Sequence, residues 1–340
     1  MHRVGLVGAG GMGQKRAAVV AAHPQCELVL VCDLDRAAAA DLAQRYGAAQ
    51  ASSWEQLVAT EDLDIVVVST THEWLAPISV AALRAGKHVL AEKPLGRNPE
   101  EVGQVVAAAA QAGRWLKAGY NHRYHPAIAK VRAVFEAGEL GPLHFIRGRY
   151  GHGGRPGYER EWRADPARSG GGEMLDQGAH LVDLALWFMG DFSRVTGMLS
   201  TSYWPIAPLE DNAFGLFATP AGQVASLHVS WTQWKNLFSF EVFGRDGYAT
   251  AHGLGRSYGP EHALVGRRAL GGGPPQEERF DFSGEDQSWT LEWEDFIRAI
   301  QTGHAPLAEG RQALKTMEWI YRLYLAAREG RSVGVAEAPS

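Results

Sequence analysis

The feature that most constrains the fold is a glycine-rich turn that follows the first apolar run of the chain. RVGLVG (3–8) continues into GAGGMG (8–13), which sets Gly8, Gly10 and Gly13 in G-x-G-x-x-G register. Between a strand and a helix, such glycines permit a tight turn, let the backbone approach a pyrophosphate and let the helix pack closely on the strand. The helix start offers unpaired N–H groups and a positive dipole end to an anion. The stretch therefore predicts a dinucleotide-binding unit, with Gly11 and Met12 also against the cofactor.

An acidic residue favours one form of the dinucleotide. Asp33 follows the next apolar run, LVLVC (28–32). A carboxylate at that place accepts hydrogen bonds from the ribose 2′-hydroxyl and repels a 2′-phosphate. We therefore predict NAD as the cofactor rather than NADP, although the nearby Arg36 keeps NADP open.

The pattern of apolar runs predicts two kinds of sheet. Over about the first 120 residues, short apolar runs alternate with helical segments, which predicts a parallel sheet covered on both faces. Later runs are longer, several alternate, and turns such as GRDG (244–247) resemble hairpins, so we expect a largely antiparallel sheet and two closing helices. The Gly/Pro-rich stretch 268–280 is predicted to be a surface loop. The expected parallel strands are RVGLVG (3–8), LVLVC (28–32), DIVVVS (64–69), HVLAE (88–92) and LKAGY (116–120).

Charge and composition exclude several classes of protein. The net charge of −5 leaves no basic excess to hold a phosphate backbone, which argues against nucleic-acid binding. No apolar run reaches the roughly 18 residues that cross a bilayer, and the N-terminus resembles a strand rather than a secretory signal. The two cysteines, Cys26 and Cys32, do not make a disulfide framework and indicate a reducing compartment. We therefore expect a cytoplasmic protein without a membrane partner.

Two further stretches carry candidate chemistry. GKHVLAEKPLGR (86–97) places Lys93 at the carboxyl end of a predicted strand, the edge where ligands bind in open α/β sheets. From spacing alone, Lys93 is equally well an ordinary exposed lysine. GGGEMLDQGAHLVDLALWFMGD (170–191) opens a predicted amphipathic helix, on which Asp176 and His180 share one face and Asp183 lies close to the same line.

The three motifs, taken in order, closely resemble the Gfo/Idh/MocA (glucose–fructose oxidoreductase / inositol dehydrogenase) family, and the resemblance runs from residue 1 to about 330. It implies an α/β fold with a Rossmann domain, a doubly wound parallel sheet, over residues 1–122. It also implies a substrate-binding and oligomerisation domain with an open, mostly antiparallel sheet over 123–335, and the C-terminal helices could pack back on the first domain. The implied activity is NAD(P)-dependent oxidation or reduction of a hydroxyl/carbonyl pair, without a metal ion.

The family resemblance also assigns roles to residues. It implies Lys93, Asp176 and His180 as the catalytic set. An imidazole titrates near pH ~6.5 and suits the base, while a lysine can stabilise alkoxide charge; which of the two takes the proton stays open. Asp176 would bind a neighbouring hydroxyl or orient the imidazole, and the Gly170–Gly172 run would leave room for nicotinamide and substrate. Further cofactor contacts are expected from Thr70, Thr71, Glu92, Lys93 and Asn121.

One stretch departs from the family pattern. Many members have Thr-Pro after the fourth strand and a histidine four residues beyond the proline. Here the run is STTHEWL (69–75), with Thr71 in place of the proline and Leu75 in place of the histidine. Thr70 and Thr71 remain plausible cofactor contacts, and His72 is expected to be a loop histidine rather than a ligand.

The segment before the catalytic helix bears on the substrate. Between 151 and 172 it holds Arg155, Arg160, Arg163 and Arg168, which suggests a phosphate or carboxylate on the substrate. Interleaved acidic residues favour mutual ion pairing instead. Aromatic side chains there could stack on a sugar ring. The expected substrate contacts are Lys93, Arg123, His152, Tyr158, Trp162, Asp176 and His180.

These observations favour an NAD-dependent dehydrogenase that acts on a sugar, amino-sugar or cyclitol. The alternatives are a glycosidase of the same fold that recycles its NAD, an NADPH-dependent ketosugar reductase, and a non-catalytic NAD-sensing regulator. A regulator would not need Lys93, Asp176 and His180 together. An open, flat sheet face promotes non-specific association unless another surface covers it. We therefore also expect a homodimer or homotetramer that packs through the C-terminal sheet.

Overall fold

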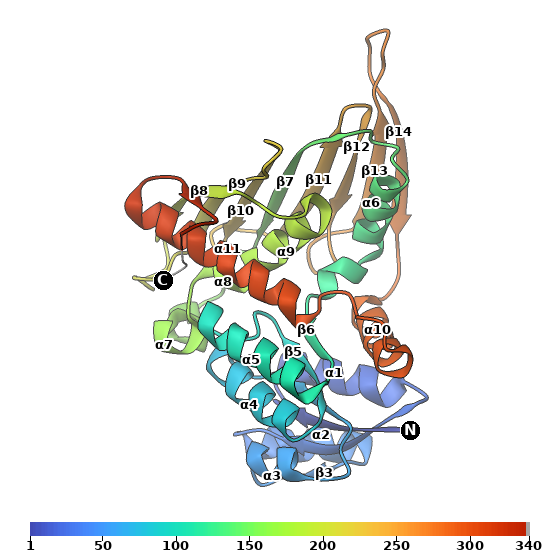
Figure 1. Cartoon of the computed structure of the whole chain (residues 1–340), viewed down its shortest axis with the longest axis vertical. Helices are drawn as coiled ribbons and strands as arrows, with labels where there is room; N and C mark the ends of the chain where they lie inside the picture. The colour runs from blue at the N-terminus through green and yellow to red at the C-terminus, as the bar shows by residue number, and fades with distance from the viewer. Residues whose placement is uncertain (338–340) are drawn as a thin grey trace. The chain divides into compact units, whose positions relative to one another are not determined.

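The computed structural model describes residues 1–337, and these divide into two compact units (Figure 1). The first unit comprises Met1–Tyr120, Ala167–Gly170 and Trp289–Lys315. The second comprises Asn121–Pro166, Gly171–Ser288 and the residues from Thr316 onward. The chain therefore passes between the units several times, and a late segment contributes to the N-terminal unit.

The first unit is built on a six-stranded parallel sheet in the order β3-β2-β1-β4-β5-β6. This order confirms the predicted doubly wound fold, with its reversal between β1 and β4. β4 is buried along its whole length, as expected of a strand with helices on both faces. The strands are β1 (His2–Val7), β2 (Cys26–Cys32), β3 (Ala49–Gln50), β4 (Ile65–Val68), β5 (His88–Glu92) and β6 (Leu116–Gly119). β3 was not predicted, because its two exposed residues carry no apolar run.

The helices of this unit follow from ordinary start and stop signals. α2 and α5 begin after Asp35 and Asn98, whose side chains accept N–H bonds from the first turn, and they end at the left-handed Gly47 and Gly113. The helices are α1 (Gly11–Ala22), α2 (Arg36–Tyr46), α3 (Trp54–Ala59), α4 (His72–Arg84), α5 (Pro99–Ala112) and most of α10 (Ser288–Thr302). α10 places Trp293 in the same apolar core as β1 and β4, so a segment near the end of the chain completes the core of the first unit.

The second unit contains a nine-stranded sheet in the order β14-β13-β12-β11-β7-β10-β9-β8-β15. All neighbouring pairs are antiparallel except β7 and β10, which confirms the predicted, mostly antiparallel sheet. The strands are β7 (Leu143–Gly151), β8 (Arg194–Ser200), β9 (Asn212–Ala218), β10 (Val224–Ser230), β11 (Leu237–Gly244), β12 (Gly247–His252), β13 (Glu261–Arg267), β14 (Gln276–Phe282) and β15 (Val333–Gly334).

Helices cover one face of this sheet (Figure 1). α9 packs on β7 and β10, and α6 packs on β12 and β13. Gly197 and Gly215 make room for Leu323 of α11, since a Cβ at either glycine would lie within 2.8 Å of that side chain. The helical segments of this unit are η1 (Asn121–Tyr124), α6 (Pro126–Glu136), η2 (Tyr158–Arg160), η3 (Trp162–Ala164), α8 (Glu173–Asp176), α9 (Gly178–Met189) and most of α11 (Gly310–Glu329), whereas most of α7 (Pro166–Ser169) belongs to the first unit.

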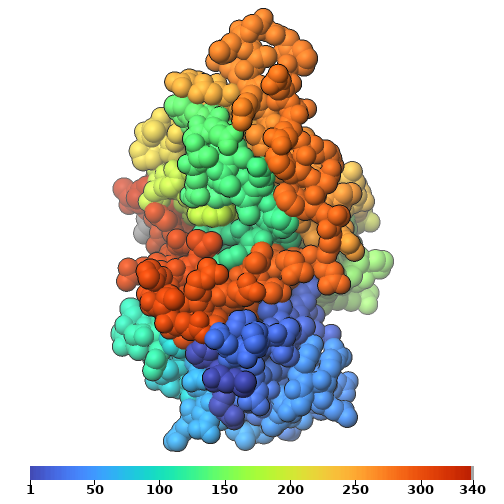
Figure 2. Space-filling view, turned by 90° about the vertical axis from the view of Figure 1, so that its right-hand side faces the viewer, coloured from blue at the N-terminus to red at the C-terminus, as the bar shows by residue number. Residues whose placement is uncertain are grey.

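The prediction of a surface loop over 268–280 is wrong for its second half. Gln276–Phe282 forms β14, the edge strand of the sheet, and pairs along its length with β13. The hairpin between the two strands projects beyond its neighbours in the second unit (orange in Figure 1 and Figure 2). The strand is rich in charged residues, which is how proteins protect an exposed sheet edge, and the same charges made it resemble a loop.

The sequence shows no stretch that could span a membrane, and the structure agrees for the part it describes. Within residues 1–337, no helix combines the length and apolar character that crossing a membrane requires.

The two cysteines lie in the core of the first unit. Cys26 and Cys32 lie at the two ends of β2 as buried, free thiols. Burial raises the pKa of the Cys26 thiol to about 11, so this cysteine is protonated at neutral pH and acts as a packing residue.

Candidate active site

The glycine turn adopts the geometry that the sequence predicts. Gly8 has φ +103°, and a Cβ there would overlap the carbonyl oxygen of Ser69 at the end of β4. A Cβ at Gly13 would overlap the carbonyl oxygen of Gly8. Both positions therefore require glycine, because the turn, the helix start and the end of β4 approach one another closely.

The other two glycines of the turn face open space. A Cβ at Gly10 or Gly11 would meet no atom within 4 Å. Gly10 precedes α1 without a side-chain cap, so the first N–H groups of the helix are not met by a capping side chain. Backbone N–H groups at a bare helix start are what a pyrophosphate needs, so these residues fit a bound dinucleotide.

Asp33 lies beside this turn at the end of β2. Its carboxylate accepts the N–H groups of Ala9 at 2.6 Å and of Asp35 at 2.8 Å. The two bonds fix the acidic side chain where the first strand enters the glycine turn. A carboxylate so placed suits a ribose hydroxyl and disfavours a 2′-phosphate. Arg36, the first residue of α2, is exposed to solvent.

The segment after β4 carries the departure from the family pattern. Thr71 precedes α4, and Thr70 is half-buried with its hydroxyl 3.2 Å from the Thr71 carbonyl oxygen. His72 is the first residue of α4 rather than a loop residue, and it is buried with Nδ1 2.8 Å from the carbonyl oxygen of Ser169. The imidazole therefore holds the 167–170 segment, an anchoring role that the sequence pattern did not reveal.

Glu92 and Lys93 follow β5. Glu92 accepts the Arg16 Nε donor at 2.8 Å, and the same buried guanidinium pairs with Glu292 of α10 at 2.5 Å. Gly119 leaves the space for this pair, because a Cβ there would lie 2.8 Å from Arg16. The Glu92 carboxylate, which was expected to contact the cofactor, therefore forms an ion pair with Arg16 inside the first unit. Lys93 is half-buried and joined to Pro94 by a cis peptide bond.

In the second unit, the predicted single helix over 170–191 is interrupted. α8 ends at Asp176 and α9 begins at Gly178, with Gln177 between them. The N–H of His180 donates to the Gln177 carbonyl at 3.0 Å, which keeps Asp176 and His180 within one local turn. Both side chains are buried.

The glycine run Gly170–Gly172 was expected to leave room for nicotinamide and substrate, but its glycines also lie close to other parts of the protein. A Cβ at Gly170 would lie 2.5 Å from the Arg97 carbonyl oxygen, and one at Gly171 would lie 2.5 Å from the Tyr324 hydroxyl. A Cβ at Gly172 would overlap the carbonyl oxygen of Glu210. Close contacts with the protein itself therefore already require glycine at these positions.

His180 lies in an aromatic environment. Its ring stacks on that of His122, with centroids 3.6 Å apart and planes at 17°. His122 Nδ1 lies 3.2 Å from the Asn121 side-chain oxygen, and the Tyr150 ring meets both imidazoles. Asn121 also donates to Ser288 at 2.9 Å. The stretch GYNHRYHP (119–126) signalled this region, but its pairing with His180 depends on η1 meeting α9, which no local pattern shows.

Arg123 and Asp183 form a buried, two-point ion pair. Arg123 Nε donates at 2.8 Å and Nη2 at 2.7 Å to the two carboxylate oxygens. Both side chains are almost fully buried. The pair joins η1 to α9 and so supports the helix that carries His180. Arg123 was expected to contact substrate, and the structure places its guanidinium on Asp183.

The remaining predicted substrate residues line the 152–163 segment. Tyr158 is buried against Trp231 and His152, with ring centroids at 5.0 Å and 5.7 Å. Its hydroxyl makes no hydrogen bond among the described residues, and burial raises its pKa strongly. Burial lowers the pKa of His152, whose Nδ1 accepts the Gly154 N–H at 2.9 Å. Trp162 is half-buried, with its ring 4.5 Å from the Arg163 guanidinium.

The arginines of this segment are all ion-paired. Arg163 Nε lies 2.9 Å from an Asp176 oxygen, and Arg155 lies 2.7 Å from Glu161. Arg160 pairs more loosely with Glu159, at 3.5 Å. Arg168, in the first unit, pairs with Glu73 at 2.8 Å. The predicted pairing with interleaved acids is therefore present for Arg155 and Arg160, whereas Arg163 and Arg168 pair chiefly with acids outside the segment.

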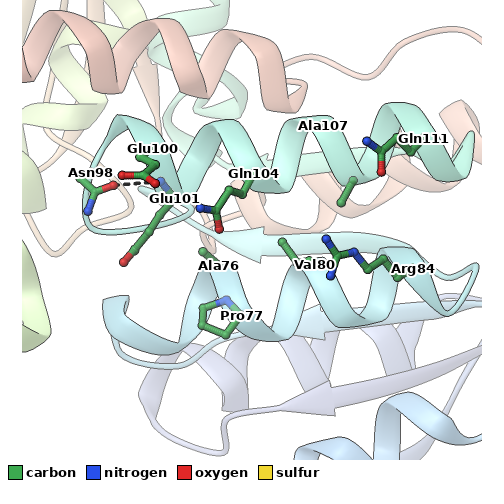
Figure 3. Close-up of a pocket in the computed structure, with 11 residues that line it drawn as sticks. Ala76, Pro77, Val80, Arg84, Asn98, Glu100, Glu101, Gln104, Ala107 and Gln111 are labelled. Atoms are coloured by element: carbon green, nitrogen blue, oxygen red, sulfur yellow. Dashed lines mark hydrogen bonds between the residues drawn. The ribbon is translucent and has the colours of Figure 1, made fainter.

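A pocket elsewhere in the first unit contains none of the predicted cofactor or catalytic residues. It is a groove between α4 and α5, with Asn98 and Glu101 at one end and Arg84 and Gln111 at the other (Figure 3). The Asn98 side chain in it is occupied in capping α5, at 2.9 Å from the Glu101 N–H. Within residues 1–337, no cluster of histidine, cysteine or acidic side chains is arranged to hold a metal ion.

The fold and the glycine turn define the class of this protein. A parallel sheet in this order, with an open glycine turn at a helix start and an acid after β2, is the NAD-binding unit of an oxidoreductase. Residues 2–120 match the model of the oxidoreductase family with an NAD-binding Rossmann fold, and residues 128–250 match the GFO/IDH/MocA C-terminal domain. The chain belongs to the Gfo/Idh/MocA family of oxidoreductases.

Individual relatives agree with this assignment. The chain is 30% identical to 1,5-anhydro-D-fructose reductase of Ensifer adhaerens over 73% of its length and 74% of the relative's. It is 30% identical to levoglucosan dehydrogenase of Pseudarthrobacter phenanthrenivorans over 64% of its own length and 59% of that protein's. The structure of a levoglucosan dehydrogenase in complex with NADH and L-sorbose superposes with a TM-score of 0.91, at 22% identity and 98% coverage of both chains, and so shares the fold.

Proposed function

We propose that this protein is an NAD-dependent dehydrogenase that oxidises or reduces one hydroxyl/carbonyl position of a neutral sugar, amino-sugar or cyclitol. The observation that carries the proposal is the buried Asp176/His180 turn, in a chain whose first unit has a dinucleotide-binding glycine turn. Titratable side chains that are held out of water cluster at catalytic sites, where burial and neighbouring charges tune their chemistry. The names of the relatives, which include a sugar dehydrogenase and an anhydrosugar reductase, support the substrate class.

The proposed chemistry assigns one task to each catalytic residue. NAD, when bound, accepts the hydride from the substrate carbon. His180 would take the hydroxyl proton as the hydride leaves, because an imidazole titrates close to neutral pH, and Lys93 would donate a hydrogen bond to the oxygen as its negative charge develops. Asp176 accepts a hydrogen bond from a neighbouring hydroxyl. The inclusion of Lys93 rests on the family resemblance and on its position after β5.

The cofactor contacts are proposed on similar grounds. Gly8, Gly10, Gly11, Met12 and Gly13 would hold the pyrophosphate. Asp33 would hold the ribose, and Thr70, Thr71 and Asn121 would lie along the nicotinamide half. Because Asp33 stands beside the turn, we propose NAD rather than NADP.

The charge balance near Asp176 favours a neutral substrate. Arg155 and Arg163 are each paired with a carboxylate at 2.9 Å or less, so a substrate phosphate or carboxylate would have to compete with Glu161 and Asp176 for these guanidinium groups. Half-buried Trp162 instead offers apolar ring surface to an uncharged ring, and the buried Tyr158 hydroxyl has no hydrogen-bond partner among the described residues. His152, beside Tyr158, completes the proposed substrate contacts of this segment.

We further propose that the protein is a cytoplasmic homodimer or homotetramer that packs through the uncovered face of the nine-stranded sheet. Met198 of β8 and Phe214 and Leu216 of β9 lie on that face, and Met198 is 75% and Leu216 52% exposed. Phe145 and Phe243 stack further along it, with centroids 4.7 Å apart. Large apolar side chains clustered on a sheet face mark an association surface.

Two tests separate this proposal from its alternatives. Incubation with NAD and a set of neutral sugars should accumulate NADH, whereas an NAD-recycling glycosidase would release nitrophenol from aryl glycosides without NADH. Titration with both cofactors should show tighter binding of NADH than of NADPH. Much tighter NADPH binding would contradict the role given to Asp33 and would favour a ketosugar reductase, and cofactor binding without any turnover would favour a regulator.

A further inference from the structure

Arg163 contacts Asp176 directly. Its Nε lies 2.9 Å from a carboxylate oxygen, and Asp176 in turn raises the pKa of the guanidinium. The carboxylate is 10% exposed and the guanidinium side chain 31% exposed. A charge-assisted bond in a site so poorly reached by water is stronger than the same bond at the surface.

The guanidinium is itself fixed on several sides. The Trp162 ring lies 4.5 Å from it, and Glu161 lies 3.8 Å away. Arg155 holds Glu161 from the far side at 2.7 Å. Arg155, Glu161, Arg163 and Asp176 therefore form a chain of alternating charge that leads from the exposed part of the 155–163 segment to the end of α8.

Four titratable groups that interact with Asp176 favour their neutral forms. Burial raises the pKa values of the tyrosines and lowers that of His152, so each favours its neutral form. The charged or titratable groups around Asp176 and Arg163 include Tyr150, His152, Tyr158, Glu161, Glu173 and Tyr258. Arg163 thus places a positive charge at hydrogen-bond distance from the Asp176 carboxylate.

We infer that Arg163 is a positioning residue for catalysis: it keeps Asp176 an ionised hydrogen-bond acceptor, aimed at a substrate hydroxyl, and does not itself bind the substrate. This inference rests on the proposed function, because it takes Asp176 as a substrate-binding carboxylate. It differs from the expectation of an anion-binding loop, since the arginine here serves a carboxylate of the protein.

The test uses Arg163→Gln, which removes the charge, and Arg163→Lys, which keeps it. Arg160→Gln in the same segment is the matched control, since Arg160 is exposed and only loosely paired. Arg163→Gln should lower kcat/KM by up to ~10²-fold, as small misplacements of a catalytic group can, and should shift the acid limb of its pH profile to higher pH. Arg163→Lys should restore part of the loss, and Arg160→Gln should resemble wild type.

A double-mutant cycle shows whether the effect passes through Asp176. In an Asp176→Asn background, Arg163→Gln should change kcat/KM by no more than about twofold. The full single-mutant loss in that background, or a pH profile equal to wild type in Arg163→Gln, would overturn the inference while leaving the proposed dehydrogenase intact.

A spectroscopic measurement keeps the inference testable without turnover. The ¹³C resonance of the Asp176 carboxyl, identified by its absence in Asp176→Asn, should titrate at higher pH in Arg163→Gln than in wild type, and at a nearly wild-type pH in Arg163→Lys. Titration at the same pH in all three proteins would overturn the inference. An inactive wild type that shows the expected carbon shifts would instead refute the proposed function alone.

Discussion

His180 and Lys93 carry the proposed proton chemistry, so substitutions at these residues should affect turnover and not the fold or the dinucleotide. We expect His180→Ala and Lys93→Ala each to lower kcat by at least ~10²-fold, the usual contribution of a general acid or base, while NADH fluorescence titration gives a nearly unchanged Kd. Arg160→Gln serves as the active control. Near-normal turnover in either alanine variant would remove that residue from the mechanism.

Two glycine-to-alanine substitutions test whether the glycine turn is shaped for the cofactor. Gly13→Ala places a Cβ on the Gly8 carbonyl oxygen and should abolish NADH binding and lower Tm. Gly103→Ala, inside α5 with no atom within 4 Å of the new Cβ, should raise stability by about 0.5–1 kcal/mol and leave binding unchanged. Thermal unfolding and NADH titration measure both effects. A Gly13→Ala protein that binds NADH normally would refute the geometry of the turn.

At the scale of elements, a buried carboxylate orders the loop between β8 and β9. Asp211 accepts the N–H groups of Ser202 at 2.8 Å, Tyr203 at 2.8 Å and Trp204 at 3.0 Å. Although burial alone would raise the Asp211 pKa, these backbone donors lower it below its usual value. The contribution of Asp211 to stability is therefore present above the unfolded pKa of about 3.9 and is lost as the pH falls through the lower folded value.

Asp211→Asn should lower the free energy of unfolding at pH 7 by on the order of 2 kcal/mol, because charged hydrogen bonds are replaced by weaker ones. The loss of stability between pH 5 and pH 3 should also be smaller in this variant. Denaturant unfolding across that range checks both points, with the exposed Asp281→Asn as control. Equal pH dependence in Asp211→Asn and wild type would show that the carboxylate does not act as described.

Elements also show how far the sequence could predict this structure. The parallel sheet followed from near-continuous apolar runs, and the glycine turn from its register, because both signals are local. β14 was missed because the charges that protect an edge strand are those of a loop. The break at Gln177 and the stacking of His122 on His180 depend on how distant segments meet, which no periodicity encodes.

At the scale of the whole molecule, association through the open sheet face is a separate prediction. Leu216→Arg places a charge on the exposed apolar face of β9 and should convert the oligomer to a monomer, because a buried unpaired charge opposes association. Leu270→Arg, at the tip of the β13–β14 hairpin and 86% exposed, is the matched control and should remain oligomeric. Light scattering at micromolar concentration measures the molar mass of each protein and so its oligomeric state. A monomeric wild type would refute the proposed surface.

The central claim is hydride exchange between an NAD cofactor and a neutral sugar or cyclitol at the Asp176/His180 site. The most direct test follows NADH formation by absorbance across free sugars, cyclitols, sugar acids and nucleotide-sugars, for wild type and for His180→Ala. We predict NADH formation with one or more neutral sugars or cyclitols, none with sugar acids or nucleotide-sugars, and loss of the signal in His180→Ala. Bound NAD without NADH formation on any substrate, or a signal that His180→Ala retains, would contradict the account.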